Sequence, residues 1–388
     1  MKKVLFSGAS VIRMEEKKCF TEKLDLLTNG DYIEKLAPTG KIKSSEYDEE
    51  INCKDFFISP GLIDAHNHLG LEPGDEYAQM QEKDAMIALR AAKNAGVDLL
   101  SGVTSMRTLG EKNYIDLEYK RAFAEGMLLG PKITVSGPAL VATGGVGWYM
   151  HQEVDGTEEI RKAVRQRLKA GVDTIKVMVT GGISDRDTDP TRCYFSQEEL
   201  NVLVDEAHEA GKPTSAHIYG GVGCYRAIEA GIDAIEHGFL FTDDMLEKMA
   251  EKMITLVITP SILSSNPSEG PEWRRLRLAA IQKRYLQVLH KAKELKITMA
   301  IGSDCNHSPY FFNNLLCELK NYGMKPEDIL ISATLNGAKV SGLGDTGQIV
   351  PGKKADLIVL KANPLEKIEA LREVALVVKE GKVISRRA

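Results

Sequence analysis

Several features that would define other classes of protein are missing from this sequence. No apolar run approaches the roughly 20 residues needed to cross a bilayer. The net charge is −5, and lysine and arginine do not cluster as a nucleic-acid surface would require. The six cysteines are scattered without a CxxC pair, which fits reduced thiols better than a disulfide framework. We therefore expect a cytoplasmic protein with neither a nucleic-acid nor a membrane partner.

What remains is typical of a globular protein with a large core. Hydrophobic residues make up 43% of the 388 residues and charged residues 27%. Segments rich in β-forming residues fill both ends of the chain, and Asn29-Gly30 is a strong hairpin signal. We predict that residues 1–58 and 346–388 together form one small β-sandwich domain.

Between these ends, from residue 59 to residue 345, short apolar segments alternate with amphipathic segments of helical length. The strand candidates are ISPGLIDAH, GVTSMRT, KITVSG, TIKVMVT, PTSAHI, AIEHG, TLVITPS and ITMAIGSD. Eight such units predict an α/β fold of the closed (β/α)8 type, the TIM barrel. Ser196 and Glu199 have the spacing of a capping box at a helix start. An open doubly wound sheet is less favoured, because no glycine-rich phosphate motif occupies its first turn.

Ionisable residues interrupt these apolar strands at their C-terminal ends, where barrel enzymes build their active sites. They are His66, His68, Lys176, His217, His237 and Asp304. His66 and His68 are two residues apart on an extended segment, so both imidazoles point the same way and can reach one ion. One buried histidine is usually a packing residue, but four at strand ends on one rim favour a metal site.

Lys176 is the most informative of these residues, because it lies in the buried segment TIKVMVT. An unpaired ammonium is costly to bury, so this side chain is paired, deprotonated or modified. One interpretation is a charge that reaches a carboxylate across the barrel. We favour a neutral amine that has captured CO₂ to become a carbamate, an anionic ligand able to bridge two metal ions. Asp304 either caps the following helix or binds a metal. The stretch from Asn306 to Pro309 separates Asp304 from that helix, which favours the role as a metal ligand.

These segments together resemble the amidohydrolase superfamily. Its metal-site segments are matched, in order, by SPGLIDAHNHLG, IKVMVTGGISD, SAHIYG, AIEHG and IGSDCN. PGKKADLIVL matches the segment with which the chain re-enters the β-sandwich domain in that superfamily. Within the superfamily the chain is most similar to the branch of Xaa-Pro dipeptidases and imidazolonepropionase-like proteins. The resemblance implies a binuclear centre of two divalent ions, with Zn²⁺ the first choice. One ion would be held by His66, His68 and Asp304 and the other by His217 and His237, with a CO₂-derived carbamate on Lys176 between them.

The same resemblance implies hydrolysis of an amide C–N bond by a metal-bridging hydroxide. Asp304 would move the proton, and Tyr219 would contact the substrate carbonyl. We expect a small-molecule substrate, first a dipeptide or an N-acyl amino acid. A cyclic amide of the imidazolonepropionase type is the alternative, and a catalytically silent barrel with an assembly role is the alternative of another class. A homo-oligomer is compatible with the superfamily.

One departure concerns the loop TGGVGWYMHQEVDG, because members of the branch often carry a histidine after TGG. Val146 takes that place here, and His151 is an open candidate for the missing role. Arg107, near the end of the second strand, is a second candidate for substrate binding, through a carboxylate. Further candidates to border the substrate are residues 71–79, 144–152, 185–195 and 263–275, the last two with Arg192, Arg274 and Arg275.

Overall fold

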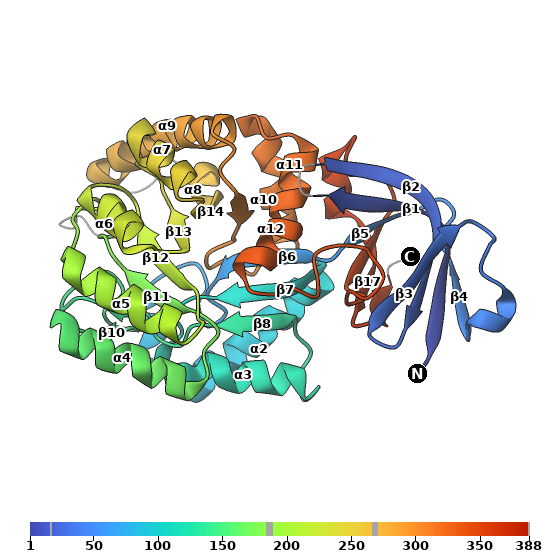
Figure 1. Cartoon of the computed structure of the whole chain (residues 1–388), viewed down its shortest axis with the longest axis horizontal. Helices are drawn as coiled ribbons and strands as arrows, with labels where there is room; N and C mark the ends of the chain where they lie inside the picture. The colour runs from blue at the N-terminus through green and yellow to red at the C-terminus, as the bar shows by residue number, and fades with distance from the viewer. Residues whose placement is uncertain (16–17, 184–188, 266–270, 387–388) are drawn as a thin grey trace.

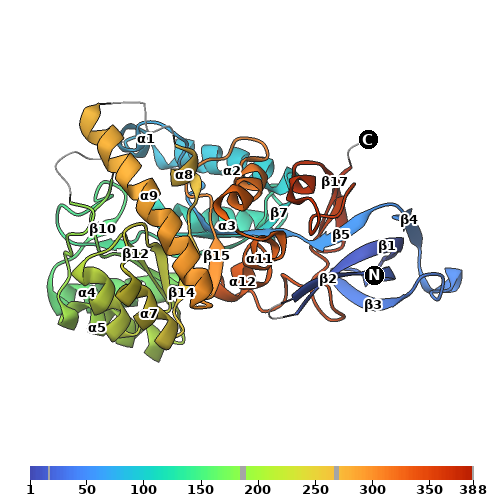
Figure 2. The same cartoon turned by 90° about the horizontal axis from the view of Figure 1, so that it is seen from above.

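The computed structural model describes residues 1–15, 18–183, 189–265 and 271–386 (Figures 1 and 2). Its larger part is a barrel of parallel strands with helices around it, and its smaller part is a β-rich domain that contains both ends of the chain. The predicted fold class, a TIM barrel with a β-sandwich made from the chain ends, is confirmed.

Within the described ranges, eight strands make up the wall of the barrel. They are β6 (Leu62–Asn67), β7 (Val103–Thr108), β8 (Lys132–Val135), β11 (Ile175–Met178), β12 (Thr214–Ile218), β13 (Ala234–His237), β14 (Thr255–Ile258) and β15 (Met299–Ile301). Their pairings are parallel. Almost every residue of these strands is buried, as expected of parallel strands covered on both faces.

The third strand position of the barrel is broken into two pieces. After β8 the chain leaves the ladder and returns as β9 (Leu140–Val141), which pairs with β11 on one side and with β10 (Gln152–Glu153) on the other. Gly137 has a positive φ of +64°, and Pro138 has no backbone N–H to donate. These two residues therefore end β8 and begin the loop that borders the site.

Backbone contacts between the last and the first strand close the barrel. Asp304 donates its N–H to the carbonyl of His66, and His68 donates its N–H to the carbonyl of Asp304, both at 2.9 Å. Gly302 permits this approach, because a Cβ at that position would lie 2.3 Å from the Cβ of His66. Closure therefore brings the two ends of the barrel sequence together at the predicted metal ligands.

Helices cover the outside of the barrel (Figures 1 and 2). The longer ones are α2 (Asp84–Leu100), α3 (Ile115–Ala124), α4 (Gly156–Ala170), α5 (Gln197–Glu209), α6 (Val222–Ala230), α7 (Asp243–Glu251), α9 (Glu272–Glu294) and α10 (Phe311–Glu318); the shorter ones are α1 (Glu76–Met80), α8 (Ser261–Ser264), α11 (Pro326–Ser332) and α12 (Leu335–Val340). The predicted capping box of Ser196 and Glu199 begins α5. No helix in the described part of the chain has the length and apolar character needed to cross a lipid bilayer.

The small domain combines the first and last strands of the chain in one sheet. Its order is β18-β17-β16-β5-β1-β2-β3, with β4 paired to β1. Its strands are β1 (Lys3–Glu15), β2 (Lys18–Asn29), β3 (Tyr32–Pro38), β4 (Glu49–Asn52), β5 (Phe57–Pro60), β16 (Leu357–Leu360), β17 (Val374–Lys379) and β18 (Lys382–Arg386). Phe6 and Leu26 share one apolar cluster with Leu357 and Val378, so the two halves of the sheet enclose a common core, as in a sandwich.

The predicted domain boundary between residues 58 and 59 falls inside β5. Ser59 and Pro60 still pair with β16, so the sandwich continues two residues past the predicted end. The segment ISPGLIDAH, predicted as one strand, is therefore two strands, β5 and β6, in different sheets. Gly61 separates them and lies tightly against the side chain of Thr104, where a Cβ would meet Oγ1 at 2.1 Å.

Gly302→Ala tests the closure of the barrel. Because the new methyl group would overlap His66, we expect the free energy of unfolding to fall by about 1–3 kcal/mol, together with weaker metal binding. Urea denaturation and metal analysis measure the two effects. Gly344→Ala is the matched control, because a Cβ there has no neighbour within 4 Å among the described residues. Equal stability of both variants would show that the close approach is not a constraint.

Candidate metal centre

A cavity of about 200 Å³ opens at the C-terminal ends of the barrel strands. All six residues predicted as metal ligands line it: His66, His68, Lys176, His217, His237 and Asp304. Two of the predicted substrate residues, His151 and Tyr219, line it as well. The structure thus gathers into one cavity residues that lie on five barrel strands or directly after them.

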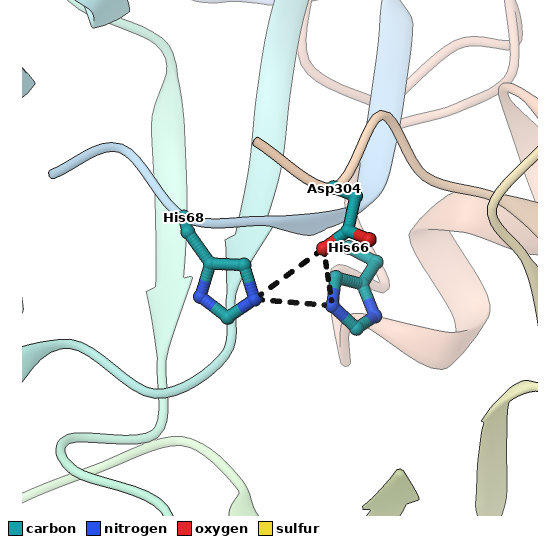
Figure 3. Close-up of side chains that lie close together, drawn as sticks. All are labelled: His66, His68 and Asp304. Carbon is teal, nitrogen blue, oxygen red and sulfur yellow. Dashed lines mark hydrogen bonds and ion pairs between the residues drawn. The ribbon is translucent and has the colours of Figure 1, made fainter. Parts of the chain in front are cut away.

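Three of these side chains converge on one point (Figure 3). The Nε2 atoms of His66 and His68 are 3.3 Å apart, and Oδ1 of Asp304 lies 3.5 Å from the first and 3.6 Å from the second. Ligands about 2.1 Å from a tetrahedral metal ion are about 3.4 Å from one another. The triad therefore fits a metal ion without rearrangement.

A second pair of histidines lies beside this triad. The rings of His217 and His237 are 4.7 Å apart, and the ring of His237 is 4.9 Å from that of His66. Nε2 of His217 donates to the carbonyl of Gly181 at 3.3 Å, so in the neutral ring Nδ1 carries the lone pair. Nδ1 of His237 is hydrogen-bonded to the Thr259 hydroxyl at 2.8 Å, which leaves Nε2 for a ligand role. Both rings are oriented by the protein as metal ligands usually are.

All four histidines are neutral at pH 7. Burial is the main cause: it lowers the pKa values of His68 and His217 to about 3 and those of His66 and His237 well below the usual 6.5. A neutral imidazole offers a lone pair to a metal, whereas an imidazolium cannot. The histidines are therefore in the form that a metal requires.

Lys176, on β11, lines the same cavity as these ligands and is 1% exposed. Its Nζ has no hydrogen-bond partner among the described residues. Burial lowers the pKa of Lys176 to about 8, although the negative charge of Glu236 opposes the change. An ammonium ion has no lone pair for a metal, whereas a carbamate on this nitrogen would supply anionic oxygens. An amine without a partner in a ring of metal ligands fits the carbamate interpretation.

Asp304 has the properties of a proton carrier. Burial, together with the negative charge of Glu76, raises the pKa of Asp304 to about 7, a suitable value for a group that takes up and releases a proton near neutral pH. The backbone of Asp304 has a φ of +74° and that of His237 a φ of +73°. Left-handed backbone is costly for residues other than glycine and is often found at functional sites.

Glu236 is a site residue that the sequence analysis did not select. It is fully buried, and its Oε2 accepts a hydrogen bond from Nδ1 of His66 at 2.7 Å. Its Oε1 accepts from Arg107 at 2.6 Å and from the Ser215 hydroxyl at 2.5 Å. The bond to Nδ1 directs the lone pair of His66 to Nε2, the atom that faces the triad. The segment AIEHG could have indicated this residue, because a glutamate in a buried strand is as unusual as the lysine in TIKVMVT.

Arg107 does not contact the cavity, so the predicted role in substrate binding does not fit its position. The side chain is 2% exposed, its Nε donates to the carbonyl of Ala65 at 2.7 Å, and its Nη2 pairs with Glu236. The guanidinium therefore lies beneath the cavity, where it compensates the charge of Glu236. The strand position was read correctly, but the sequence does not show to which side a buried residue points.

The loops that border the cavity agree in part with the predicted ones. Val146, Met150 and His151 line it from the loop 144–152, and Leu71 and Glu76 line it from the loop 71–79. Burial lowers the pKa of His151 well below 6.5, and its Nδ1 has no hydrogen-bond partner among the described residues. A neutral, buried ring on the lining is compatible with the role left open for this residue.

The two other predicted loops are described only in part. Residues 184–188 and 266–270, which fall on the loops 185–195 and 263–275, lie outside the described residues. Arg192, Arg274 and Arg275 are not part of the cavity lining that the structure describes. Arg274 instead lines a smaller adjoining pocket with Arg277, and the two pockets share Ile183, Ile262 and Ser265.

Known proteins share this architecture over most of the chain. The family model of the Amidohydrolase family matches residues 57–384. The ochratoxinase of Aspergillus niger is 32% identical over 353 residues, which cover 81% of this chain and 72% of that protein. The imidazolonepropionase of Ruegeria pomeroyi is 24% identical over 341 residues, 80% of each. The solved structure of a Xaa-Pro dipeptidase with methionine bound in its active site is 29% identical, covers 98% of this chain and 99% of that one, and has a TM-score of 0.89.

A TIM barrel with a cavity lined by histidines, an aspartate and a buried lysine defines a class of hydrolytic enzymes that use divalent metal ions. The matches then identify the group within this class: the chain belongs to the Amidohydrolase family. It is an enzyme that hydrolyses amide bonds, in the branch of peptidases and imidazolonepropionase-like proteins. The predicted family, branch and enzyme class are confirmed.

Glu236→Gln tests the buried network under the metal centre. Removing one partner of a buried ion pair should lower the free energy of unfolding by about 3–5 kcal/mol. Loss of the carboxylate that orients His66 should also weaken metal binding about 10–100-fold. Denaturation and competition with a chromophoric chelator measure the two effects.

A double variant separates stability from metal binding. Arg107→Met with Glu236→Gln removes both charges, so we expect most of the stability to return while metal affinity stays low. Glu251→Gln, on the exposed end of α7, is the control for loss of one carboxylate. Wild-type metal affinity in Glu236→Gln would contradict the orienting role.

Proposed function

We propose that this protein is a binuclear metal-dependent amidohydrolase of the Xaa-Pro dipeptidase or carboxypeptidase type, which cleaves the amide bond of a dipeptide or an N-acyl amino acid. The observation that carries the proposal is the buried amine of Lys176, without a hydrogen-bond partner in the described structure, inside a ring of neutral histidines and one carboxylate. An unpaired ammonium at this position would destabilise the barrel, because its charge is desolvated. A carbamate on the same nitrogen would instead be stabilised by the two metal ions that it binds.

The residues present fit two divalent ions. His66, His68 and Asp304 would hold one, His217 and His237 the other, and the carbamate on Lys176 would serve both. This set of nitrogen and oxygen ligands suits Zn²⁺, and Mn, Co or Fe would also fit. When bound, the ions supply an activated water molecule and polarise the amide carbonyl.

The chain itself supplies the proton transfer and the orientation of the substrate. Asp304 takes a proton at its carboxylate and returns it to the leaving amine, for which a pKa of about 7 is well suited. Burial raises the pKa of Tyr219 well above 10, so its hydroxyl stays protonated and can donate to the substrate carbonyl oxygen. Tyr219 stacks on Phe239 at 4.8 Å, which fixes the direction of the ring.

The surroundings of the cavity support a substrate that carries a carboxylate. The adjoining pocket of about 80 Å³ presents Arg274 and Arg277 on α9, next to Ile262 and Ser265, which it shares with the cavity. Arginine binds carboxylates through paired hydrogen bonds. We assign this pocket to the C-terminal carboxylate of the leaving amino acid. The six free cysteines suit a reducing compartment, and we propose the cytoplasm.

A screen of dipeptides and N-acyl amino acids, with Zn²⁺ and bicarbonate present, tests the activity. Asp304→Asn should keep its fold but lose kcat by about 10²–10⁴-fold, because proton transfer is lost. Near-wild-type turnover by this variant would exclude the proposed proton transfer. A cyclic amide in the same screen tests the alternative reaction, and the absence of both stoichiometric metal and turnover would favour a silent barrel.

Lys176→Ala tests the carbamate. We expect the variant to lose bound metal, because the anionic ligand common to both ions is gone. Metal analysis of the purified protein measures this loss, and a carbamate signal after incubation with ¹³C-bicarbonate should be seen by NMR only in the parent. Lys169→Ala, at an exposed position of α4, is the control. Two tightly held ions in Lys176→Ala would contradict a bridging carbamate.

A further inference from the structure

A group of side chains that none of the proposed steps uses borders the same cavity. It consists of Glu76 and Tyr77 at the start of α1, and Trp148 and Tyr149 in the loop between β9 and β10. Glu76 and Tyr149 line the cavity itself. Tyr77 and Trp148 lie against Tyr149 and are each 49% exposed. We call the three rings of Tyr77, Trp148 and Tyr149 the aromatic rim.

The rings of the aromatic rim contact one another mostly edge to face. Tyr77 and Tyr149 are 5.5 Å apart at 84°, Trp148 and Tyr149 are 6.1 Å apart at 78°, and Tyr77 and Trp148 are 6.1 Å apart at 47°. A single edge-to-face contact covers one face of one ring only, and Tyr77 and Trp148 remain half exposed. The face of an aromatic ring is negative and attracts cations, and tryptophan does so most strongly.

Glu76 places a carboxylate next to these rings. Its Oε2 accepts a hydrogen bond from the hydroxyl of Tyr149 at 2.9 Å. The cations of α2 that are closest to it in sequence have other partners, since Arg90 pairs with Glu82 and Lys93 pairs with Glu72.

The position of Glu76 is well supported by the surrounding structure. Asp75 caps α1 by accepting the N–H of Ala78 at 3.0 Å. The side chain of Gln79 exchanges two hydrogen bonds with the backbone of Glu72, at 2.8 and 2.9 Å. Met80 at the end of the helix is fully buried. Glu76 is therefore held in place before any ligand arrives, which lowers the cost of binding.

Glu76 is the carboxylate of the cavity lining that the proposed metal centre does not use. The described side chains on the lining include two carboxylates, Glu76 and Asp304, and no arginine. Asp304 and the carbamate on Lys176 would be neutralised by the two metal ions, whereas Glu76 is held by the neutral hydroxyl of Tyr149. An ammonium group next to Glu76 would satisfy its carboxylate and meet the faces of the aromatic rim.

We propose that Glu76 and the aromatic rim form a binding site for the free ammonium group of the substrate, so that the enzyme acts on dipeptides rather than on N-acyl amino acids. The inference rests on the proposed amide hydrolysis and narrows it. An acylated nitrogen carries no charge, so it would leave the Glu76 carboxylate desolvated without a cation, which is unfavourable. The ammonium would lie on the acyl side of the scissile bond, and the carboxylate of the leaving amino acid on the other.

Binding can be measured without turnover, because the chain has two tryptophans and one of them is in the rim. In the metal-loaded Trp273→Phe protein, fluorescence reports on Trp148. Phenethylammonium should bind about 10–100-fold more tightly than N-acetylphenethylamine, as expected for a charge-assisted hydrogen bond with a cation–π contact. Adding Glu76→Gln should remove this preference. Glu72→Gln, which removes a carboxylate outside the cavity lining, should keep it.

Equal binding of the two probes, or an unchanged preference in Glu76→Gln, would overturn the proposal. Loss of bound metal in Glu76→Gln would also overturn it, because Glu76 would then belong to the metal centre. Turnover gives an independent readout: in Glu76→Gln the ratio of kcat/KM for a dipeptide to that for its N-acetyl derivative should fall about 10–100-fold. Any effect of Glu76 on the proton transfer by Asp304 is common to both substrates and cancels in this ratio.

The two proposals can fail separately. If only N-acyl amino acids are hydrolysed, the ammonium site is wrong while the proposed amide hydrolysis stands. If none of the amides is hydrolysed but phenethylammonium is still preferred, the ammonium site stands and the proposed function fails.

Discussion

The closure of the barrel between β15 and β6 is the constraint on which the site depends. Asp304 and His66 come from opposite ends of the barrel sequence, yet Asp304 donates its N–H to the carbonyl of His66 and accepts from the N–H of His68 across this seam. Gly302 makes the approach sterically allowed. The seam fixes Asp304 in a left-handed conformation, which a free loop would leave. The carboxylate therefore faces the two histidines before any metal arrives.

The barrel interior also has to stabilise charges where parallel strands are normally apolar. Glu236 is the centre of this arrangement, because it accepts hydrogen bonds from His66, Arg107 and Ser215 at once. A buried carboxylate with three donors, one of them an arginine, is tolerated, whereas an isolated one would be very costly. The Nζ of Lys176, by contrast, has no hydrogen-bond partner among the described residues.

Much of the fold could be predicted from the sequence, because the signals are local. Alternation of apolar and amphipathic segments gave the strands and helices, and the capping box at Ser196 gave the start of α5. The ligand candidates followed from a simple contradiction, ionisable residues at the ends of buried strands. The predicted strand KITVSG ends at Gly137, and the return of the chain as β9 was missed, because two residues, Leu140 and Val141, are too few to give a strand pattern. The division of ISPGLIDAH between two sheets was missed because this segment is one continuous apolar run in the sequence.

By itself, the sequence determined the family, the barrel and the set of residues with metal-binding chemistry, since each depends on residue type and spacing along the chain. Only the tertiary structure decided the direction in which each buried side chain points. It turned Arg107 beneath the cavity toward Glu236, and it placed Glu76 beside Tyr149 at the entrance. The physical reason is that partners distant in sequence meet only when the barrel closes and the loops pack over it. Local pattern carries no information on which of two faces, both buried, a side chain will occupy.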